Sequence, residues 1–172
     1  FVLPLFLRGD PREPVASPFA RPGWAGRAQP PARSFAVPAS GEKAFEWSWE
    51  APRGLSVSGE VAFSGVPSRA RLVWETPGGS FVVLADLSGQ SRAVVDLDAR
   101  DLAFRASIGL DPFDESLVGL FDGRGTVTVR VESDVPVERS SLVVRIPGDR
   151  WGIFGTDQRG RDVFRLFLAG IC

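Results

Sequence analysis

The side chains of this sequence that could do chemistry are almost all carboxylates. The chain has 21 Asp and Glu residues, but it has no His and no Tyr, and its one Cys is Cys172. Without His, a Ser-His-Asp triad, a Cys-His pair and a His-ligated zinc site are all excluded. A single Cys excludes an internal disulfide and a thiolate metal cluster. No pair of carboxylates stands out as an acid and a base, so we expect a protein that is not an enzyme and has no metal or cofactor.

Two clusters of carboxylates have the residue types that a hard cation such as calcium prefers. They are Asp96, Asp98 and Asp101, and then Asp111, Asp114 and Glu115. In the first cluster the position that a calcium loop gives to glycine holds Asp101, and Ser107 stands at the position of the closing acid. Acids at the start of a helix account for both clusters more simply, because they lie at the positive end of its dipole.

An aromatic stripe is the other candidate site. Phe45, Trp47 and Trp49 alternate with Glu46, Ser48 and Glu50, so the three rings share one face of a strand. Flat rings on an exposed face could stack on sugars, and Trp47 and Trp49 would then form a ligand platform. Alternation with acids and serine instead marks the aromatic face as the core side, which is the interpretation we favour.

The elements around these residues are predicted to be mostly strands. Gly and Pro together number 33 (19 and 14) among 172 residues, which favours many turns over a helical bundle. Pro77-Gly78-Gly79 predicts a hairpin between two of the strands. Asp98 could cap a helix over 99–107, and a second helical turn is expected around 115–121. The seven strand candidates are 45–50, 55–63, 69–75, 81–85, 93–97, 126–131 and 141–146.

These patterns predict a mainly all-β fold: an antiparallel β-sandwich of about seven strands with one or two short helices, a Pro-rich N-terminal arm and a C-terminal helical stub. We expect the sandwich at 41–148, where eleven basic and sixteen acidic residues give a net charge of −5. Residues 8–40 contain seven prolines and are expected to be an extended tether. The apolar residues 1–7 are either the end of a transmembrane helix or a first strand, and 149–172 are expected to lead into the next transmembrane helix.

The most specific motif lies near the C-terminus. It reads Phe154-Gly155-Thr156-Asp157-Gln158-Arg159-Gly160-Arg161-Asp162-Val163-Phe164. Thr156 or Asp157 could cap the apolar helix that follows, because an acid or hydroxyl there accepts from its free amides. Gly160 would permit a close backbone approach, while Arg161 and Asp162 could pair with neighbouring groups.

This motif resembles the F-G-T-D-x-x-G-R-D-[VI]-[LFW] signature of the second permease subunit of peptide and nickel ABC importers. The resemblance covers about the last twenty residues, and it departs from the family at Arg165, Leu166, Ala169 and Cys172. It implies a structural or gating role for the motif residues and a place between the first two transmembrane helices, on the extracytoplasmic side of the inner (plasma) membrane. The residues concerned are Gly155, Thr156, Asp157, Gly160, Arg161 and Asp162.

The resemblance also implies a function. The sandwich would be an insertion in an external loop that takes part in the import of peptides or related small solutes, by contact and not by catalysis. Its partners would be the other permease subunit, a substrate-binding protein and cytoplasmic ATPase subunits, with membrane at both ends. A net charge of −1 gives no footprint for nucleic acid. The alternative is a secreted or surface carbohydrate-binding sandwich that uses the Trp stripe.

Overall fold

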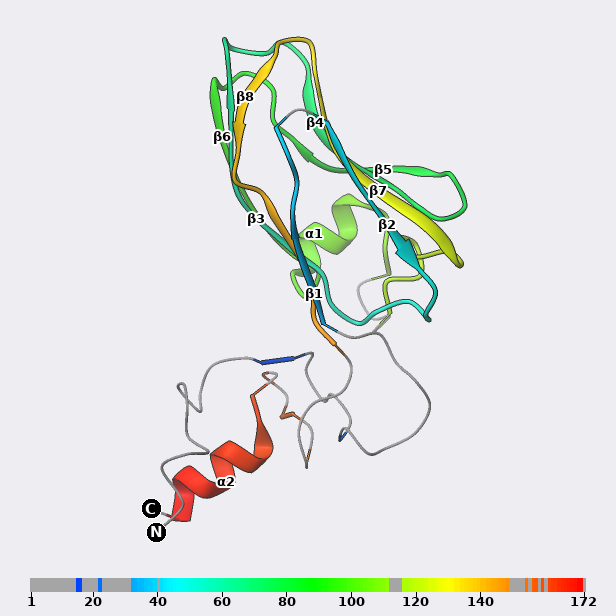
Figure 1. The fold of residues 1–172 in the computed structure, drawn as a ribbon, viewed down its shortest axis with the longest axis vertical. Coiled ribbons are helices and arrows are strands. Elements are labelled where there is room, and N and C mark those ends of the chain that lie inside the picture. Colours follow the sequence, from blue (N-terminus) through cyan, green and yellow to red (C-terminus); the bar gives the residue numbers. More distant parts are fainter. Residues whose placement is uncertain are drawn as a thin grey trace. The chain divides into compact units, whose positions relative to one another are not determined.

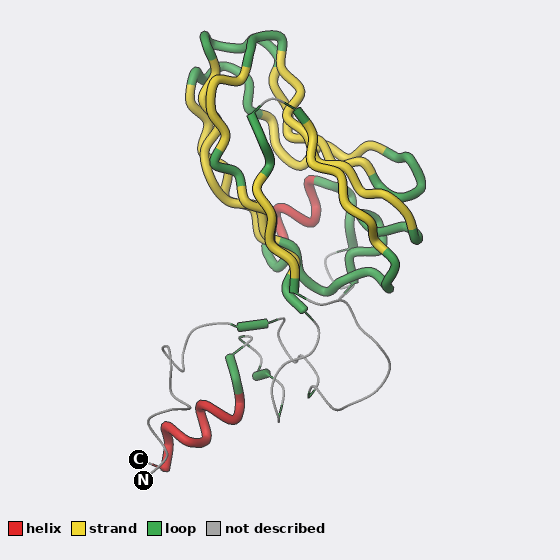
Figure 2. The backbone as a smooth tube through the Cα atoms, viewed as in Figure 1, coloured by secondary structure: helices red, strands yellow, loops and turns green. Residues whose placement is uncertain are grey.

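The fold was determined as a computed structural model that describes residues 15–16, 22, 32–39, 41–111, 116–148, 154, 156–157, 159 and 161–171. Within these ranges the chain forms nine strands and two short helices (Figures 1 and 2). The strands are β1 Arg33–Ala36, β2 Glu42–Trp47, β3 Ser56–Phe63, β4 Ala70–Glu75, β5 Phe81–Asp86, β6 Arg92–Asp98, β7 Gly125–Ser133, β8 Val137–Ser140 and β9 Val143–Ile146. The helices are α1 Leu102–Ser107 and α2 Val163–Ile171.

The strands form two antiparallel sheets that face each other. One sheet has the order β1-β9-β3-β6, with β8 also paired to β3, and the other has the order β2-β7-β4-β5. Residues Ser34–Ile146 form one compact unit that contains both sheets and α1. The predicted antiparallel β-sandwich is therefore confirmed, while the C-terminal segment with α2 is described by itself below.

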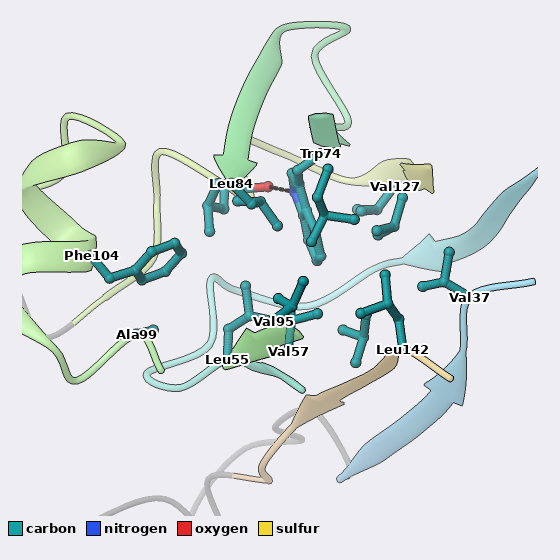
Figure 3. Close-up of a cluster of buried hydrophobic side chains, with 14 of the residues drawn as sticks. Val37, Leu55, Val57, Trp74, Leu84, Val95, Ala99, Phe104, Val127 and Leu142 are labelled. Atoms are coloured by element: carbon teal, nitrogen blue, oxygen red, sulfur yellow. Dashed lines mark hydrogen bonds between the residues drawn. The ribbon is translucent and has the colours of Figure 1, made fainter. Parts of the chain in front are cut away.

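The core lies between the two sheets, where strands of both sheets turn apolar side chains inward (Figure 3). On β7, Val127 and Val129 are fully buried, whereas Thr126 and Thr128, which alternate with them, face outward. This is the period of two that a half-buried strand requires. The largest fully buried side chains are Trp47, Trp74, Leu72, Leu117, Leu120, Leu142 and Ile146.

Aromatic rings fill one part of this core. The ring of Phe121 lies 4.6 Å from that of Trp47 and 5.2 Å from that of Trp74, in tilted and edge-on arrangements that suit aromatic quadrupoles. Trp74 would bury a polar N–H, and its Nε1 therefore donates to the Leu120 carbonyl at 2.8 Å (Figure 3). Each of these rings comes from a different part of the chain, so the cluster joins β2, β4 and the segment before β7.

The predicted hairpin is also confirmed. β4 and β5 pair antiparallel from Arg71↔Asp86 to Glu75↔Phe81, with a bulge between Leu72 and Val73. Asp122 stabilises the turn between the strands, accepting hydrogen bonds from the Gly78 amide at 2.9 Å and the Thr76 hydroxyl at 3.1 Å.

Two strands were not predicted, and one of them moves the start of the sandwich. β1 lies within the expected tether 8–40, and the unit begins at Ser34 instead of 41. Pro38, just after β1, is tolerated because β1 is an edge strand, where a missing donor breaks no ladder. β8 was missed because its four residues, Val-Glu-Arg-Ser, show no apolar alternation. Val37 anchors this part of the arm to the sandwich, because its side chain is 1% exposed and its amide donates to the Leu142 carbonyl at 2.9 Å.

The helix α1 starts later than predicted. Asp101, not Asp98, is its N-cap and accepts from the Ala103 amide at 2.8 Å. Asp98 instead accepts from the Arg100 amide at 2.9 Å and pairs with the Arg100 guanidinium. The second predicted helical turn is a single turn, in which the Phe121 amide donates to the Leu117 carbonyl at 3.0 Å, while 112–115 lie outside the described residues.

Candidate functional site

The C-terminal motif folds into a closed turn. Thr156 and Asp162 form an isolated antiparallel bridge, and the Asp157 amide donates to the Arg161 carbonyl at 3.0 Å. In return the Arg161 amide donates to Asp157 Oδ1 at 3.0 Å. Thr156 and Asp162 are only 6% and 7% exposed, so the two ends of the turn are buried. Gly155 and Gly160 lie outside the described residues.

Asp157 is the centre of this turn. Its Oδ1 also accepts from the Arg159 amide at 2.8 Å, and its Oδ2 accepts from Arg161 Nε at 2.7 Å. Partial burial acts to raise the pKa of Asp157, but the hydrogen bonds from the Arg161 side chain and from the amides of Arg161 and Arg159 outweigh it and lower the pKa. The carboxylate therefore stays ionised and holds the turn by charge-assisted bonds.

Asp162 begins the apolar helix. Its Oδ1 accepts from the Phe164 amide at 2.9 Å and from the Arg165 amide at 3.3 Å, which is the geometry of an N-cap. The expectation that Thr156 or Asp157 caps this helix is wrong. Asp157 accepts hydrogen bonds from the amides of Arg159 and Arg161, which belong to the turn and not to the helix. The predicted pairing of Arg161 is confirmed, with Asp157 as its partner. Asp162 lies 3.8 Å from Arg165 Nε.

The helix α2 carries an apolar surface from its first turn. Phe164 packs against Phe154 at a ring-centroid distance of 5.8 Å, and Phe167 is 58% exposed. Its nine residues have a high mean hydropathy, in line with the increasingly apolar sequence. Within the described ranges, none of the helices has the length and apolar character that crossing a bilayer requires. The predicted membrane segment at 1–7 lies outside the described residues.

One ring of the aromatic stripe, that of Trp47, is not accessible to a ligand. Trp47 is 1% exposed and packs edge-on against Trp49 at a centroid distance of 5.4 Å, while Trp49 and Phe45 are half-buried. Both faces of the Trp47 ring are therefore covered by protein, and a sugar cannot stack on it. Trp47 is part of the core, as the alternation predicts, and Phe45 and Trp49 pack against that core. Trp47 is therefore removed from the candidate ligand residues.

The acidic residues mostly have structural partners. Asp98 holds Arg100 and Asp101 caps α1, while Asp114 and Glu115 of the second cluster lie outside the described residues. No group of three possible metal ligands comes together in the part of the chain that the structure describes.

A surface hollow of about 350 Å³ was not predicted. Arg69, Arg71, Glu132, Ser133 and Asp134 line it, where β4 begins and β7 ends. Its acids already have partners: Glu132 binds Arg130 at 2.9 Å, and Asp134 accepts from the Ser68 hydroxyl and from the Ser68 and Arg69 amides. Strand alternation in the sequence indicates that Arg69 and Arg71 share one face, and that Glu132 and Asp134 share one face. The sequence does not show that these two pairs of residues meet, because that depends on the pairing of β4 with β7.

Comparison with protein-family models, with curated proteins and with solved structures finds no match to this chain.

Proposed function

We propose that this chain is an extracytoplasmic part of a permease subunit of an ABC importer for peptides or related small solutes. The observation that carries the proposal is the closed turn from Thr156 to Asp162, which ends in the N-cap of the apolar helix α2. This is the segment whose sequence resembles the permease signature. The sandwich acts by contact with other proteins and has no reaction of its own.

The roles of the motif residues support the proposal, because a short sequence match then corresponds to one folded unit. Asp157 needs both of its oxygens to hold Arg161 and two amides, and Asp162 needs its Oδ1 to start the helix. This set of bonds requires a carboxylate at positions 157 and 162 and a guanidinium at position 161. A generic helix start needs a cap alone.

The charge of the sandwich suggests what it contacts. A net charge of −5 over 41–148 would speed association with a basic surface, such as one on a substrate-binding protein that delivers solute. ATP hydrolysis belongs to separate cytoplasmic subunits in this proposal.

The test is uptake of a labelled peptide by cells that carry variants in the intact permease. Arg161→Gln removes the guanidinium that Asp157 holds, whereas Arg159→Gln changes an exposed side chain two residues away and serves as the matched control. We expect uptake to fall at least about tenfold for Arg161→Gln, with the protein still in the membrane, and to stay near wild type for Arg159→Gln.

Topology gives a separate readout. The exposed residue Ser91, in the turn before β6, can be replaced by Cys and reacted with a membrane-impermeant maleimide in intact spheroplasts. Labelling without permeabilisation is expected. Labelling that requires permeabilisation, or equal uptake by both arginine variants, would contradict the proposal.

A further inference from the structure

The free edge of strand β5 has the composition of a pairing surface. β5 is the last strand of its sheet, and no described residue pairs with its outer side (Figure 1). Its first five residues, Phe81-Val82-Val83-Leu84-Ala85, contain no charge, no proline and no glycine. An uncharged, β-prone edge exposes a row of unpaired backbone groups that a further strand can satisfy.

The other free edges of the sandwich are protected in the ways that natural sheets use. β2 carries Glu42, Lys43 and Glu46, β6 carries Arg92, Asp96 and Asp98, and β8 carries Glu138 and Arg139. β1 has only four residues and is followed by Pro38. Among the described strands, β5 is therefore the edge without a charge or a proline over its first five residues, and the bulge in its ladder with β4 leaves Phe81–Val83 as its regular part.

Two exposed apolar side chains make the edge of β5 more favourable for pairing with a further strand. Phe81 is 60% exposed and Val83 is 42% exposed, and both lie on the outer face of the sheet beside the buried Val73. Arg130 reaches across this face and places its guanidinium 5.1 Å from the centre of the Phe81 ring. Aromatic and β-branched residues opposite each other on neighbouring strands stabilise a sheet.

We propose that β5 pairs antiparallel with β5 of a second copy of this chain, across a two-fold axis, with Val82 facing Val82. This register sets Phe81 of each copy opposite Val83 of the other, so two aromatic–valine pairs form. Asp86 falls opposite Gly78, and no charge meets a like charge.

Charge decides in favour of a second copy over the other edges of the sandwich. Pairing β5 with β2, β6 or β8 would place their acids and bases against an apolar strand. Another β5 is uncharged over Phe81–Val83, the residues that face each other in this register, so it satisfies this part of the edge without this cost.

The experiment uses the full chain and a matched pair of substitutions. Val83→Lys places a charge on the β5 edge, and Val94→Lys places the same charge on β6, where Val94 is 76% exposed and lies between Arg92 and Asp96. Sedimentation equilibrium gives the dimer dissociation constant of each. We expect a wild-type dimer at micromolar to submillimolar concentration, a dissociation constant raised about tenfold or more by Val83→Lys, and little change with Val94→Lys.

Hydrogen exchange of the wild-type chain supplies a readout that needs no variant. Amide exchange within Phe81–Val83 should slow as protein concentration rises, while exchange in β6 should not change. A monomer at all concentrations, a dimer unaffected by Val83→Lys, a dimer weakened equally by both substitutions, or exchange in β5 that ignores concentration would each overturn the proposal. Circular dichroism melting establishes that both variants fold.

Discussion

Glycine at position 59 is required by the backbone that crosses next to it. The residue has a φ of +137°, and a Cβ there would lie 2.4 Å from the Ser141 carbonyl oxygen. A hydrogen bond next to Gly59 joins the two segments, because the Ser141 amide donates to the Glu60 carbonyl at 2.8 Å. The chain between β8 and β9 can therefore lie against the central strand β3 only where β3 has no side chain.

Gly59 is required both by its positive φ and by the lack of space for a Cβ, and a series of three glycine substitutions separates these two requirements. Gly59→Ala should cost about 3 kcal/mol of unfolding free energy, because strain and a backbone clash act together. Gly89→Ala, with a φ of +77° and open space around it, should cost about 1 kcal/mol. Gly65→Ala, with neither demand, should change stability by less than about 0.5 kcal/mol. Urea unfolding measures all three, and equal costs at 59 and 89 would contradict the clash.

Asp134 makes stability depend on pH. Hydrogen bonds from the Ser68 hydroxyl and then from the Arg69 amide lower the pKa of Asp134 below its usual 3.8. The unfolded chain thus takes up the proton more readily, so the stabilisation is complete above about pH 4 and is lost as pH falls through the lowered pKa.

Asp134→Asn imitates the protonated carboxyl group and tests this dependence. We expect a lower Tm than wild type at pH 7 and a difference that shrinks toward zero below pH 3.8. Asp96→Asn, at an exposed position of β6, should change Tm little at either pH. A Tm difference that stays constant from pH 7 to pH 2 would show that the loss has another cause.

At the scale of the element, α1 and the loop after it depend on a buried arginine. Arg105 is 5% exposed and lies in the last turn of the six-residue helix. Its guanidinium donates to the carbonyls of Ala99 at 3.2 Å, Asp111 at 2.9 Å and Ser116 at 3.4 Å. A short helix has little stability of its own, so these bonds fix its position between β6 and the segment that leads to β7.

Arg105→Met retains the length of the side chain and removes its donors. The carbonyls would then be buried without these bonds, and we expect a loss of about 3 kcal/mol in unfolding free energy. Arg100→Met, which breaks the mostly exposed pair with Asp98, should cost about 1 kcal/mol or less. Differential scanning calorimetry compares the two, and a loss at Arg105 no greater than at Arg100 would contradict a structural role for the buried guanidinium.

For the whole molecule, the position of β1 decides where the sandwich starts. β1 extends the sheet at the β9 edge, and Phe35 packs on Phe45 of the other sheet at a centroid distance of 4.7 Å. Val37 is fully buried next to Leu142. A piece of the proline-rich arm is thus part of the core.

A chain shortened to 41–172 should therefore be less stable than one shortened to 32–172, by about 2 kcal/mol or more, because the burial of Val37 and the pairing of β1 are lost. Val37→Ala in the full chain should reproduce about half of this loss, and Val94→Ala on the surface should not. Thermal unfolding of the four proteins gives the comparison. Equal stability of the two shortened chains would place β1 outside the cooperative unit.

Much of the fold was predictable because strand alternation is a local signal. All seven expected strands are present, although β2 is Glu42–Trp47 and leaves 48–50 of the expected strand 45–50 outside it. The core position of Trp47 follows from its alternation with Glu46 and Ser48. β1 and β8 were not predictable, since four residues are too few to show a period. For the candidate site, the pairing of Arg161 was expected, but Asp157 as its partner and Asp162 as the cap of α2 were not. The closed turn directs the Asp157 carboxylate toward the amides of Arg159 and Arg161 instead of toward the helix.

The sequence alone determined the residue chemistry: without His and with one Cys, triads, imidazole ligands and internal disulfides are excluded whatever the fold. It also determined the fold class, because apolar residues at every second position can be buried only by a sheet. The tertiary structure decided which strands are neighbours, why position 59 must be glycine, which carbonyls hold Arg105, and that β5 is the last strand of its sheet. These features depend on pairing between segments up to more than 100 residues apart, and such pairing leaves no mark in any one segment.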